Sequence, residues 1–386
     1  MTNLISEGTR LISWCKKYAL PLWANNGLDR KGGFYEALKI NGEPVLNSLR
    51  RVRVQARQCY VYAHAGHLEW FDNAHKISNH GWEYLTANGF QGGNEINNGD
   101  FAGCAHLLNS DGSLNDGSRD TYAQAFLLLA SSWRYRAFND PQSLECLEKT
   151  TEFLNTFLKA DNEGWVEGTP KDLPRRQNPH MHLFEAFLAA YEATSDLKYM
   201  NLADDIFSIF KNKFFDESTH ALLEFFDQNW LPDTKKGDLV EPGHMMEWCW
   251  LIHLYERLSI KNVSDYAEKL YQAGIKLGTS YITGLIINEV HIKGRKTNTS
   301  SRLWPQTEYI KANIARAEKG FNDAEDAAAE MIDKLFSYFL DVPTIGGWHD
   351  ERDFSNNLIS NSMPASTFYH IMSAAAEVHR YINEKT

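Results

Sequence analysis

Apolar residues recur at helical spacing through most of the chain, in the pattern of helices that bury one face. Glycine, proline and asparagine punctuate the ends of these apolar segments. The sequence therefore predicts an all-α protein. Its twelve predicted helices lie near residues 3–24, 50–67, 70–88, 120–137, 141–160, 179–195, 197–213, 242–258, 262–280, 303–319, 323–341 and 364–383.

Short strand-like segments lie between alternate pairs of predicted helices. They read GGFYEAL, GWVEG, LLEFFDQNW, GLIINEV and GGWHDERDF. We expect them to form short β-hairpin loops at one end of the helical framework. No linker-like or low-complexity segment divides the chain, so we expect a single domain over residues 1–386.

A proline recurs at a nearly constant interval at the start of four predicted helices. Pro179, Pro242, Pro305 and Pro364 are separated by 63, 63 and 59 residues. We expect each to occupy the first helical position, where its missing N–H costs nothing. Extending the period backwards by about 60 residues reaches the helices near 120 and 50, which gives six helical hairpins.

Six hairpins can stack as an open solenoid or close into a ring. Solenoids repeat short units with recognisable consensus residues, whereas these units are long, divergent in sequence and joined by hairpin-like loops. We therefore predict a closed barrel of six hairpins. Its inner helices would run parallel, so that their N-terminal ends meet at one mouth.

The starts of the predicted inner helices carry side chains suited to proton transfer, which we expect to face a shared cavity. A guanidinium and a phenol come from the earlier helices, and imidazoles and carboxylates from the later ones. The candidates are Arg57, Tyr122, His180, His182, His244, Glu247, Glu308 and His370.

Spacing on the helix narrows these candidates. His244 and Glu247 are three residues apart and project from one face, where a carboxylate can fix the tautomer of an imidazole. His180 and His182 point about 200° apart, so only one of them can face the cavity. Trp248, Trp304 and Trp348 either pack in the core or, at the mouth, stack on the C–H faces of a sugar.

Charge and composition exclude several classes of partner. The net charge is −11, from 39 Lys and Arg against 50 Asp and Glu, and no basic run is present to bind nucleic acid. No apolar run approaches the roughly 18 residues of a membrane span, and no signal peptide is evident, so we expect a cytoplasmic protein. The sequence is compatible with a homo-oligomer.

The sequence offers no sign of a metal site or a cofactor. The five cysteines are widely spaced and form no CxxC pair, which argues against a zinc site or a disulfide framework. No HExxH or similar short ligand pair occurs. We expect a mechanism without metal or cofactor.

Three motifs, EPGHMMEW, RLWPQTE and NPHMHLFEAF, resemble the N-acylglucosamine 2-epimerase superfamily, which includes cellobiose 2-epimerases, mannose isomerases and sulfoquinovose-type isomerases. The agreement extends from QARQCYVYA through TFYHIMSA, nearly the whole chain. The resemblance implies an (α/α)6 barrel with an acid/base pair and a sugar site. It assigns the pair to His244 and His370, and the sugar site to Arg57, His182, Glu247, Trp304 and Glu308.

WPQTE is closer to the mannose and aldose isomerase branch than to the epimerases, so the resemblance implies conversion of D-mannose to D-fructose through an enediolate. The converging helix ends would stabilise the oxyanion and keep both imidazoles neutral. A sugar 2-epimerase and a sulfoquinovose isomerase are the near alternatives. A glycoside hydrolase using Glu247 and Glu308, or a noncatalytic sugar-binding or scaffold protein, would leave three histidine-bearing helix starts without a role.

Overall fold

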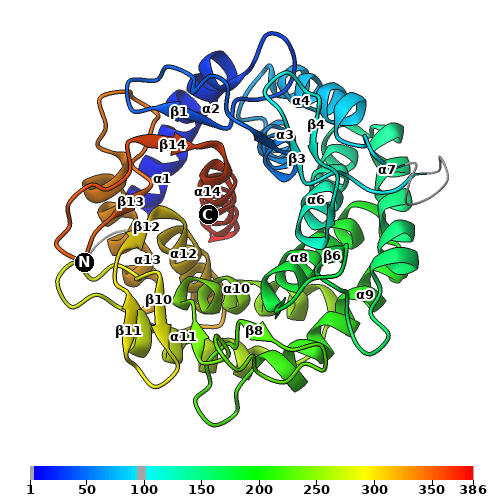
Figure 1. Cartoon of the computed structure of the whole chain (residues 1–386). Coiled ribbons are helices and arrows are strands. Elements are labelled where there is room, and N and C mark those ends of the chain that lie inside the picture. Colours follow the sequence, from blue (N-terminus) through cyan, green and yellow to red (C-terminus); the bar gives the residue numbers. More distant parts are fainter. Residues whose placement is uncertain (1–3, 94–100, 386) are drawn as a thin grey trace.

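The computed structural model describes residues 4–93 and 101–385 (Figure 1). Residue 3 of the predicted helix 3–24, and both ends of the predicted domain 1–386, lie outside these ranges. Within them, the helices form two concentric rings. The predicted (α/α)6 barrel is confirmed.

The inner ring is closed. Each of its helices packs against the next, and the last packs against the first. In order, they are α3 (Val52–His67), α6 (Thr121–Phe138), α8 (Gln177–Thr194), α10 (Pro242–Ser259), α12 (Leu303–Glu318) and α14 (Ala365–Lys385).

The outer ring places one helix behind each inner helix, and α1 covers α14. Four outer helices continue into a wider π-helical turn, and α1 is also followed by α2 (Leu20–Leu22) and the turn η2 (Trp23–Gly27). The outer helices are α1 (Leu4–Trp14) with η1 (Cys15–Ala19), α4 (Ala74–Asn88), α7 (Pro141–Phe153) with η3 (Leu154–Leu158), α9 (Leu197–Ile209) with η4 (Phe210–Phe214), α11 (Ser264–Gly278), and α13 (Ala324–Leu335) with η5 (Phe336–Leu340).

The two rings differ in how they bury apolar residues. Outer helix α11 buries Ala267, Leu270, Tyr271 and Gly274, a single stripe at spacings of three and four residues. Inner helix α10 is buried along every face for most of its length. A helix with one apolar stripe stays at the surface, whereas one that is buried all round must lie between neighbours, and this difference sorts the helices into rings.

Small antiparallel sheets form a collar at the end where the inner helices begin. Each inner helix starts within two residues of a strand that pairs with a strand of another loop. The two-stranded sheets are β1 (Ala37–Lys39) with β14 (Ser362–Pro364), β5 (Arg119–Asp120) with β6 (Gly168–Thr169), β7 (Arg175–Arg176) with β8 (Phe225–Phe226), and β12 (Ser301–Arg302) with β13 (Glu351–Arg352). Two sheets have three strands: β3 (Leu107–Leu108) lies between β2 (Arg50–Arg51) and β4 (Leu114–Asp116), and β10 (Glu289–His291) lies between β9 (Leu239–Val240) and β11 (Lys296–Asn298).

The periodic prolines mark the mouth, but only Pro242 occupies a first helical position. Pro179 and Pro305 are the third residues of α8 and α12, and Pro364 ends β14 immediately before α14. The expected position is wrong for these three. The first four N–H groups of a helix have no intrahelical partner, so a proline is tolerated throughout that turn.

One close approach fixes the start of α10. A Cβ on Gly278, at the end of α11, would lie 2.2 Å from the Cβ of Pro242, so only glycine allows the two helices to pack this closely. Elsewhere, no helix within the described residues combines the length and apolarity needed to cross a membrane.

Candidate active site

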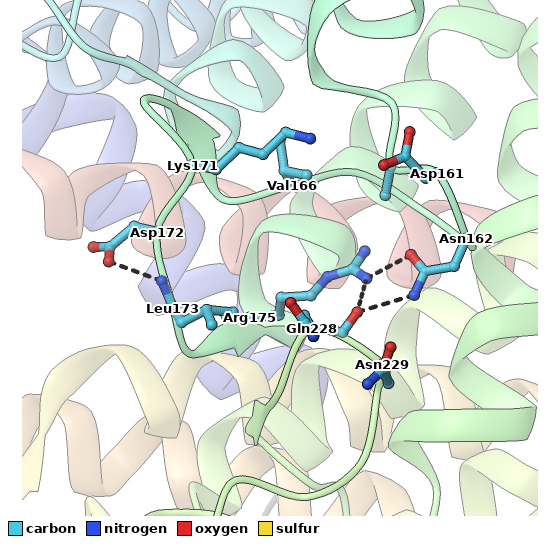
Figure 2. A pocket seen from close by; sticks show the side chains of 10 residues that line it. Asp161, Asn162, Val166, Lys171, Asp172, Leu173, Arg175, Gln228 and Asn229 are labelled. Carbon is cyan, nitrogen blue, oxygen red and sulfur yellow. Dashed lines mark hydrogen bonds between the residues drawn. The ribbon is translucent and has the colours of Figure 1, made fainter.

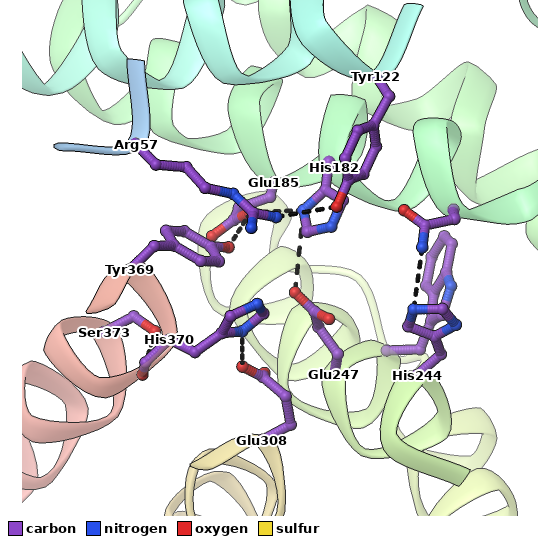
Figure 3. Close-up of polar contacts among 12 residues, drawn as sticks. Arg57, Tyr122, His182, Glu185, His244, Glu247, Glu308, Tyr369, His370 and Ser373 are labelled. Atoms are coloured by element: carbon purple, nitrogen blue, oxygen red, sulfur yellow. Dashed lines mark hydrogen bonds and ion pairs between the residues drawn. The ribbon is translucent and has the colours of Figure 1, made fainter. Parts of the chain in front are cut away.

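Of the predicted site residues, all but His180 are joined by a chain of contacts across the six inner helices. Figure 3 shows most of them turned towards one central space. Arg57 contacts Tyr122, which packs on His182, and His182 lies near Glu247. The contacts continue through Glu308 to His370, and through Trp304 to His244. The collar of sheets holds these helix starts in register.

His370 is held by a carboxylate. Its Nδ1 lies 2.7 Å from Oε1 of Glu308, which leaves Nε2 for a substrate. Burial, together with the positive charges of Arg57 and Lys311, lowers the pKa of His370 well below its ordinary value. The imidazole is therefore neutral and able to accept a proton.

His244 has the opposite electrostatic surroundings. Its Nδ1 lies 3.1 Å from both carboxylate oxygens of Glu224, and Glu241 Oε2 is 3.7 Å away. Burial opposes protonation, but these two carboxylates outweigh it and raise the pKa of His244 to about 10. The expectation that both imidazoles are neutral is therefore wrong for His244, because the carboxylates of Glu224 and Glu241 outweigh the effects of burial and of the helix dipole.

Trp304 lies between the two histidines. Its ring centre is 5.1 Å from that of His244 and 5.5 Å from that of His370. Gly243 makes room for it, since a Cβ there would lie 2.7 Å from Cη2 of Trp304. The half-buried indole thus forms an aromatic wall spanning both imidazoles.

The other two tryptophans belong to the core. Trp248 is fully buried, and its Nε1–H donates to Oε1 of Gln177 at 2.7 Å. Trp348 stacks on Trp23 with 5.3 Å between ring centres. Of the three tryptophans considered for the mouth, only Trp304 lies beside the histidines.

His182 faces the central space, and His180 faces away from it. Nδ1 of His182 lies 3.2 Å from Oε2 of Glu185 and 3.9 Å from Oε1 of Glu247, while burial lowers its pKa to about 4. His180 instead accepts a hydrogen bond from the backbone N–H of Trp165 through Nε2 at 3.0 Å. The two side chains diverge as their spacing requires.

Arg57 provides a fixed positive charge. Its Nη2 donates to the hydroxyl of Tyr122 at 2.8 Å, and its Nη1 donates to the carbonyl of Ser366 at 3.3 Å. The guanidinium also lies over the ring of Phe126, 4.0 Å from its centre. These contacts join α3 to α6 and α14 at the site.

Comparison with known proteins fits this geometry. The family profile described as N-acylglucosamine 2-epimerase (GlcNAc 2-epimerase) matches residues 33–374. The chain belongs to the N-acylglucosamine 2-epimerase family. The match covers five inner helices and the start of α14, and it includes every predicted site residue.

Curated relatives within the family are isomerases and epimerases. A mannose-6-phosphate isomerase of Rhizobium meliloti is 35% identical over 96% of both chains. A cellobiose 2-epimerase of Bacteroides fragilis is 25% identical over 75% of this chain and 77% of its own. A D-mannose isomerase of Thermobifida fusca is 25% identical over 81% of this chain and 80% of its own. The protein is accordingly a sugar isomerase or epimerase.

Solved structures share the fold. A D-mannose isomerase superposes with a TM-score of 0.85 at 20% identity, covering 96% of this chain and 97% of its own. The cellobiose 2-epimerase of Spirochaeta thermophila gives 0.87 at 17% identity, with 99% and 98% covered. A family 76 α-mannanase of Bacteroides thetaiotaomicron gives 0.64 at 16% identity, with 97% of each chain covered.

Glu247 has open hydrogen-bonding positions at both carboxylate oxygens in this epimerase-family site. Both of its oxygens are buried and have no hydrogen-bond partner within the described residues. Burial and the neighbouring Glu308 raise its pKa well above the ordinary value. A sugar hydroxyl entering the space shown in Figure 3 would satisfy these oxygens.

Among the residues that the structure describes, three sets of side chains have the composition of metal ligands. Short sequence motifs do not reveal them, because the members of each set come from more than one element. In each set, the potential ligand atoms lie within 4.8 Å of one another. The sets are His182, Glu185 and Glu247; Glu224, Glu241 and His244; and Glu247, Glu308 and His370. In the third, the ammonium of Lys311 lies 2.6 Å from Glu308 and would compete with a metal cation.

Sequence reasoning missed several residues that hold the histidines. Glu224 lies 20 residues before His244 and meets it only through the fold, and Asn178 contacts Nε2 of His244 at 3.0 Å. Tyr369 donates to Glu185, which in turn contacts His182. Only Glu185, on the same helical face as His182, has a spacing that could have revealed it.

Two hollows flank the loop of residues 171–173 outside the catalytic space. One, of about 810 Å³, reaches Asp120 beside the site. The other, of about 660 Å³, is lined by this loop together with Asn162, Arg175 and Gln228 (Figure 2). There Arg175 donates to Oδ1 of Asn162 and to the carbonyl of Gln228, and so joins the loops that form its wall.

Proposed function

We propose that this protein is an aldose–ketose isomerase that converts D-mannose to D-fructose through a cis-enediolate, without a metal ion. The observation that carries the proposal is the pair of histidines in opposite protonation states beside one tryptophan face. His370 is neutral, whereas His244 has a pKa of about 10 and is protonated. A general base must begin the reaction neutral and a general acid must begin it protonated, and this separation of the two pKa values provides both states.

The proposed steps follow from these states once the sugar ring has opened. Nε2 of His370 takes the C2 proton, the C–H electrons form the C1–C2 double bond, and the C1 carbonyl electrons move to O1 to give the enediolate. O1 then takes a proton from His244. His244 then removes the O2 proton, the C2 carbonyl forms, and His370 returns its proton to C1. Both histidines end in their starting states, so the cycle needs no external acid or base.

The remaining site residues would bind the substrate. Trp304 would contact the C–H face of the sugar, and the open oxygens of Glu247 would take hydroxyl groups. Arg57 would stabilise negative charge on the enediolate from its fixed position.

An isomerase and a 2-epimerase differ in where the proton returns. Delivery to the opposite face of C2, from a histidine on the other side of the sugar, would give glucose from mannose. We favour the isomerase because of the WPQTE segment that carries Trp304 and Glu308. The Rhizobium relative is named for a phosphorylated sugar, so a phosphate or sulfonate at C6 belongs in the same test.

The hydrolase alternative fits the site less well. A glycoside hydrolase needs one carboxylic acid and one carboxylate on opposite sides of the scissile bond. Glu308 is instead held by His370 and Lys311, and it lies directly beside Glu247.

The test is product analysis by NMR in D2O, with mannose, mannose 6-phosphate, sulfoquinovose and cellobiose supplied separately. We expect fructose as the main early product from mannose, with deuterium at C1 in the fraction of turnovers in which the proton on His370 exchanges with solvent before it is returned. Glucose as the main early product would make the protein a 2-epimerase. If only the phosphorylated or the sulfonated sugar is converted, that sugar and not D-mannose is the substrate.

A further inference from the structure

Lys311 is a lysine with no access to solvent, placed directly behind the site. It lies on α12 one turn after Glu308, is 0% exposed, and its Nζ lies 2.6 Å from Oε2 of Glu308. The ammonium also lies 3.7 Å from the centre of the Trp250 ring. Lysine is almost never fully buried without a charged partner, so this placement calls for an explanation.

Glu308 connects this lysine to the proposed base. Its Oε2 faces Lys311, and its Oε1 lies 2.7 Å from Nδ1 of His370. An ammonium, a carboxylate and an imidazole therefore lie in sequence, and Figure 3 shows the contact between the carboxylate of Glu308 and the imidazole of His370.

Lys311 also interacts with a group of buried carboxylates. Glu308, Glu247 and Glu185 all raise the pKa of Lys311, against the effect of its burial. In return, Lys311 opposes the rise in the pKa of Glu308 that burial causes. The titratable and charged groups that face Glu308 and His370 from neighbouring helices are Arg57 on α3, His182 and Glu185 on α8, His244 and Glu247 on α10, and Tyr369 on α14.

The charge of Glu308 decides which nitrogen of His370 is basic. A carboxylate only accepts hydrogen bonds, so ionised Glu308 requires the proton of neutral His370 to sit on Nδ1. Nε2 then carries the free lone pair. A protonated Glu308 can donate to Nδ1 instead, which puts the histidine proton on Nε2 and removes its basicity towards the sugar.

We propose that Lys311 is a positioning residue that keeps Glu308 ionised and thereby holds His370 in the tautomer that accepts the sugar C2 proton. The proposal rests on the proposed function, because it takes His370 as the base. Lys311 does not touch the substrate. It acts only through Glu308.

The direct test is the tautomer of His370, read by NMR of enzyme labelled with 15N-histidine, without substrate. The His370 signals are assigned by their absence in His370→Asn. At pH 7, we expect the Nδ1–H tautomer in the unaltered protein and the Nε2–H tautomer in Lys311→Met. Raising the pH should ionise Glu308 in the variant and restore Nδ1–H. An unchanged tautomer in Lys311→Met at pH 7 would overturn the proposal.

Lys149→Met is the matched control. Lys149 lies 2.6 Å from Oε1 of Glu145, the same separation as in the buried pair, but both side chains are largely exposed. This variant should keep the Nδ1–H tautomer and the activity of the unaltered protein. The tautomer is read without turnover, so an unaltered protein that fails to convert mannose would refute the proposed function and leave the Lys311 result standing.

Activity provides a second arm, in which recovery at higher pH separates the loss of Glu308 ionisation from poor folding of Lys311→Met. We expect that variant to lose about 10²-fold in kcat at pH 7, with little change in KM and recovery at higher pH. In a Glu308→Gln background, adding Lys311→Met should cost less than about twofold further, because the lysine acts through the missing carboxylate. Losses that multiply in the double variant would show a separate structural role and overturn the proposal.

Discussion

At the scale of single residues, His244 and His370 differ through the groups that hold their Nδ1 atoms. His244 faces Glu224 and Glu241, which raise its pKa to about 10, whereas burial keeps His370 neutral. The reactive form, with His244 protonated and His370 neutral, therefore persists through neutral pH. We expect kcat/KM for mannose to fall as pH rises past about 10, where His244 loses its proton.

The carboxylate of Glu224 should set the pH at which kcat/KM falls on the alkaline side, which is the alkaline limb of the pH profile. Glu224→Gln removes the largest contribution that raises the pKa of His244, so the limb should move to lower pH. The measurement is the pH profile of kcat/KM, with Glu217→Gln, an exposed glutamate on the surface, as the control. A limb that does not move in Glu224→Gln would show that another group controls it.

The two histidines should act as a unit. His244→Asn and His370→Asn should each lower kcat by at least about 10², the usual scale for a general acid or base. The double variant should lose far less than the product of the two effects, because both residues serve one proton-transfer sequence. Circular dichroism checks the fold. Near-normal turnover by folded His244→Asn would refute the two-histidine mechanism and move the role to His182 or a carboxylate.

At the scale of elements, the position of His244 depends on how closely α11 packs against the start of α10. Gly278→Ala places a methyl group 2.2 Å from the Cβ of Pro242, two residues before His244. We expect about 1–3 kcal/mol of destabilisation, from the backbone shift that such overpacking forces. Activity should also fall, because His244 moves with the start of α10.

Thermal and denaturant unfolding measure the loss of stability in Gly278→Ala, and kcat measures the loss of activity. Gly117→Ala is the control, because a Cβ there meets its nearest atom at an ordinary 3.4 Å. Equal stability of the two glycine variants would show that α11 can move away from Pro242 without cost.

Elements with a long repeating pattern could be predicted, whereas two-residue strands could not. The helices follow from apolar spacing over many residues, but Arg175 and Arg176 form β7 only because Phe225 and Phe226 pair with them. LLEFFDQNW accordingly supplies just those two strand residues rather than a longer strand. Strand pairing at this length is set by where the barrel places the loops.

The same limit applies to the site. Residues on inner-helix starts, such as His244 and Glu247, could be predicted because the helical period places them at the mouth. Glu224 comes from a loop, and Lys311 reads in sequence as an ordinary surface lysine. Their roles depend on contacts between elements, which no local pattern encodes.

At the scale of the whole molecule, the clusters of imidazole and carboxylate raise the question of a bound ion. In two of the clusters, His244 and His370 are already held by carboxylates, and Lys311 neutralises part of the charge. We expect dialysis against EDTA to leave the conversion of mannose unchanged. Loss of activity that Mn²⁺, Co²⁺ or Zn²⁺ restores would refute the metal-independent mechanism and identify one of these clusters as a metal centre.

The inner ring closes where α14 meets α3, and this seam joins parts of the chain that are far apart in sequence. The hydrogen bond from Arg57 to the carbonyl of Ser366 spans 309 residues. Closing so long a loop carries a large entropic cost, which local helix formation does not share. During folding, the helices can therefore form early while the catalytic centre stays unassembled until His370 arrives at the seam. Catalysis therefore requires the closed inner ring, and helices that have formed without closing the ring are not active.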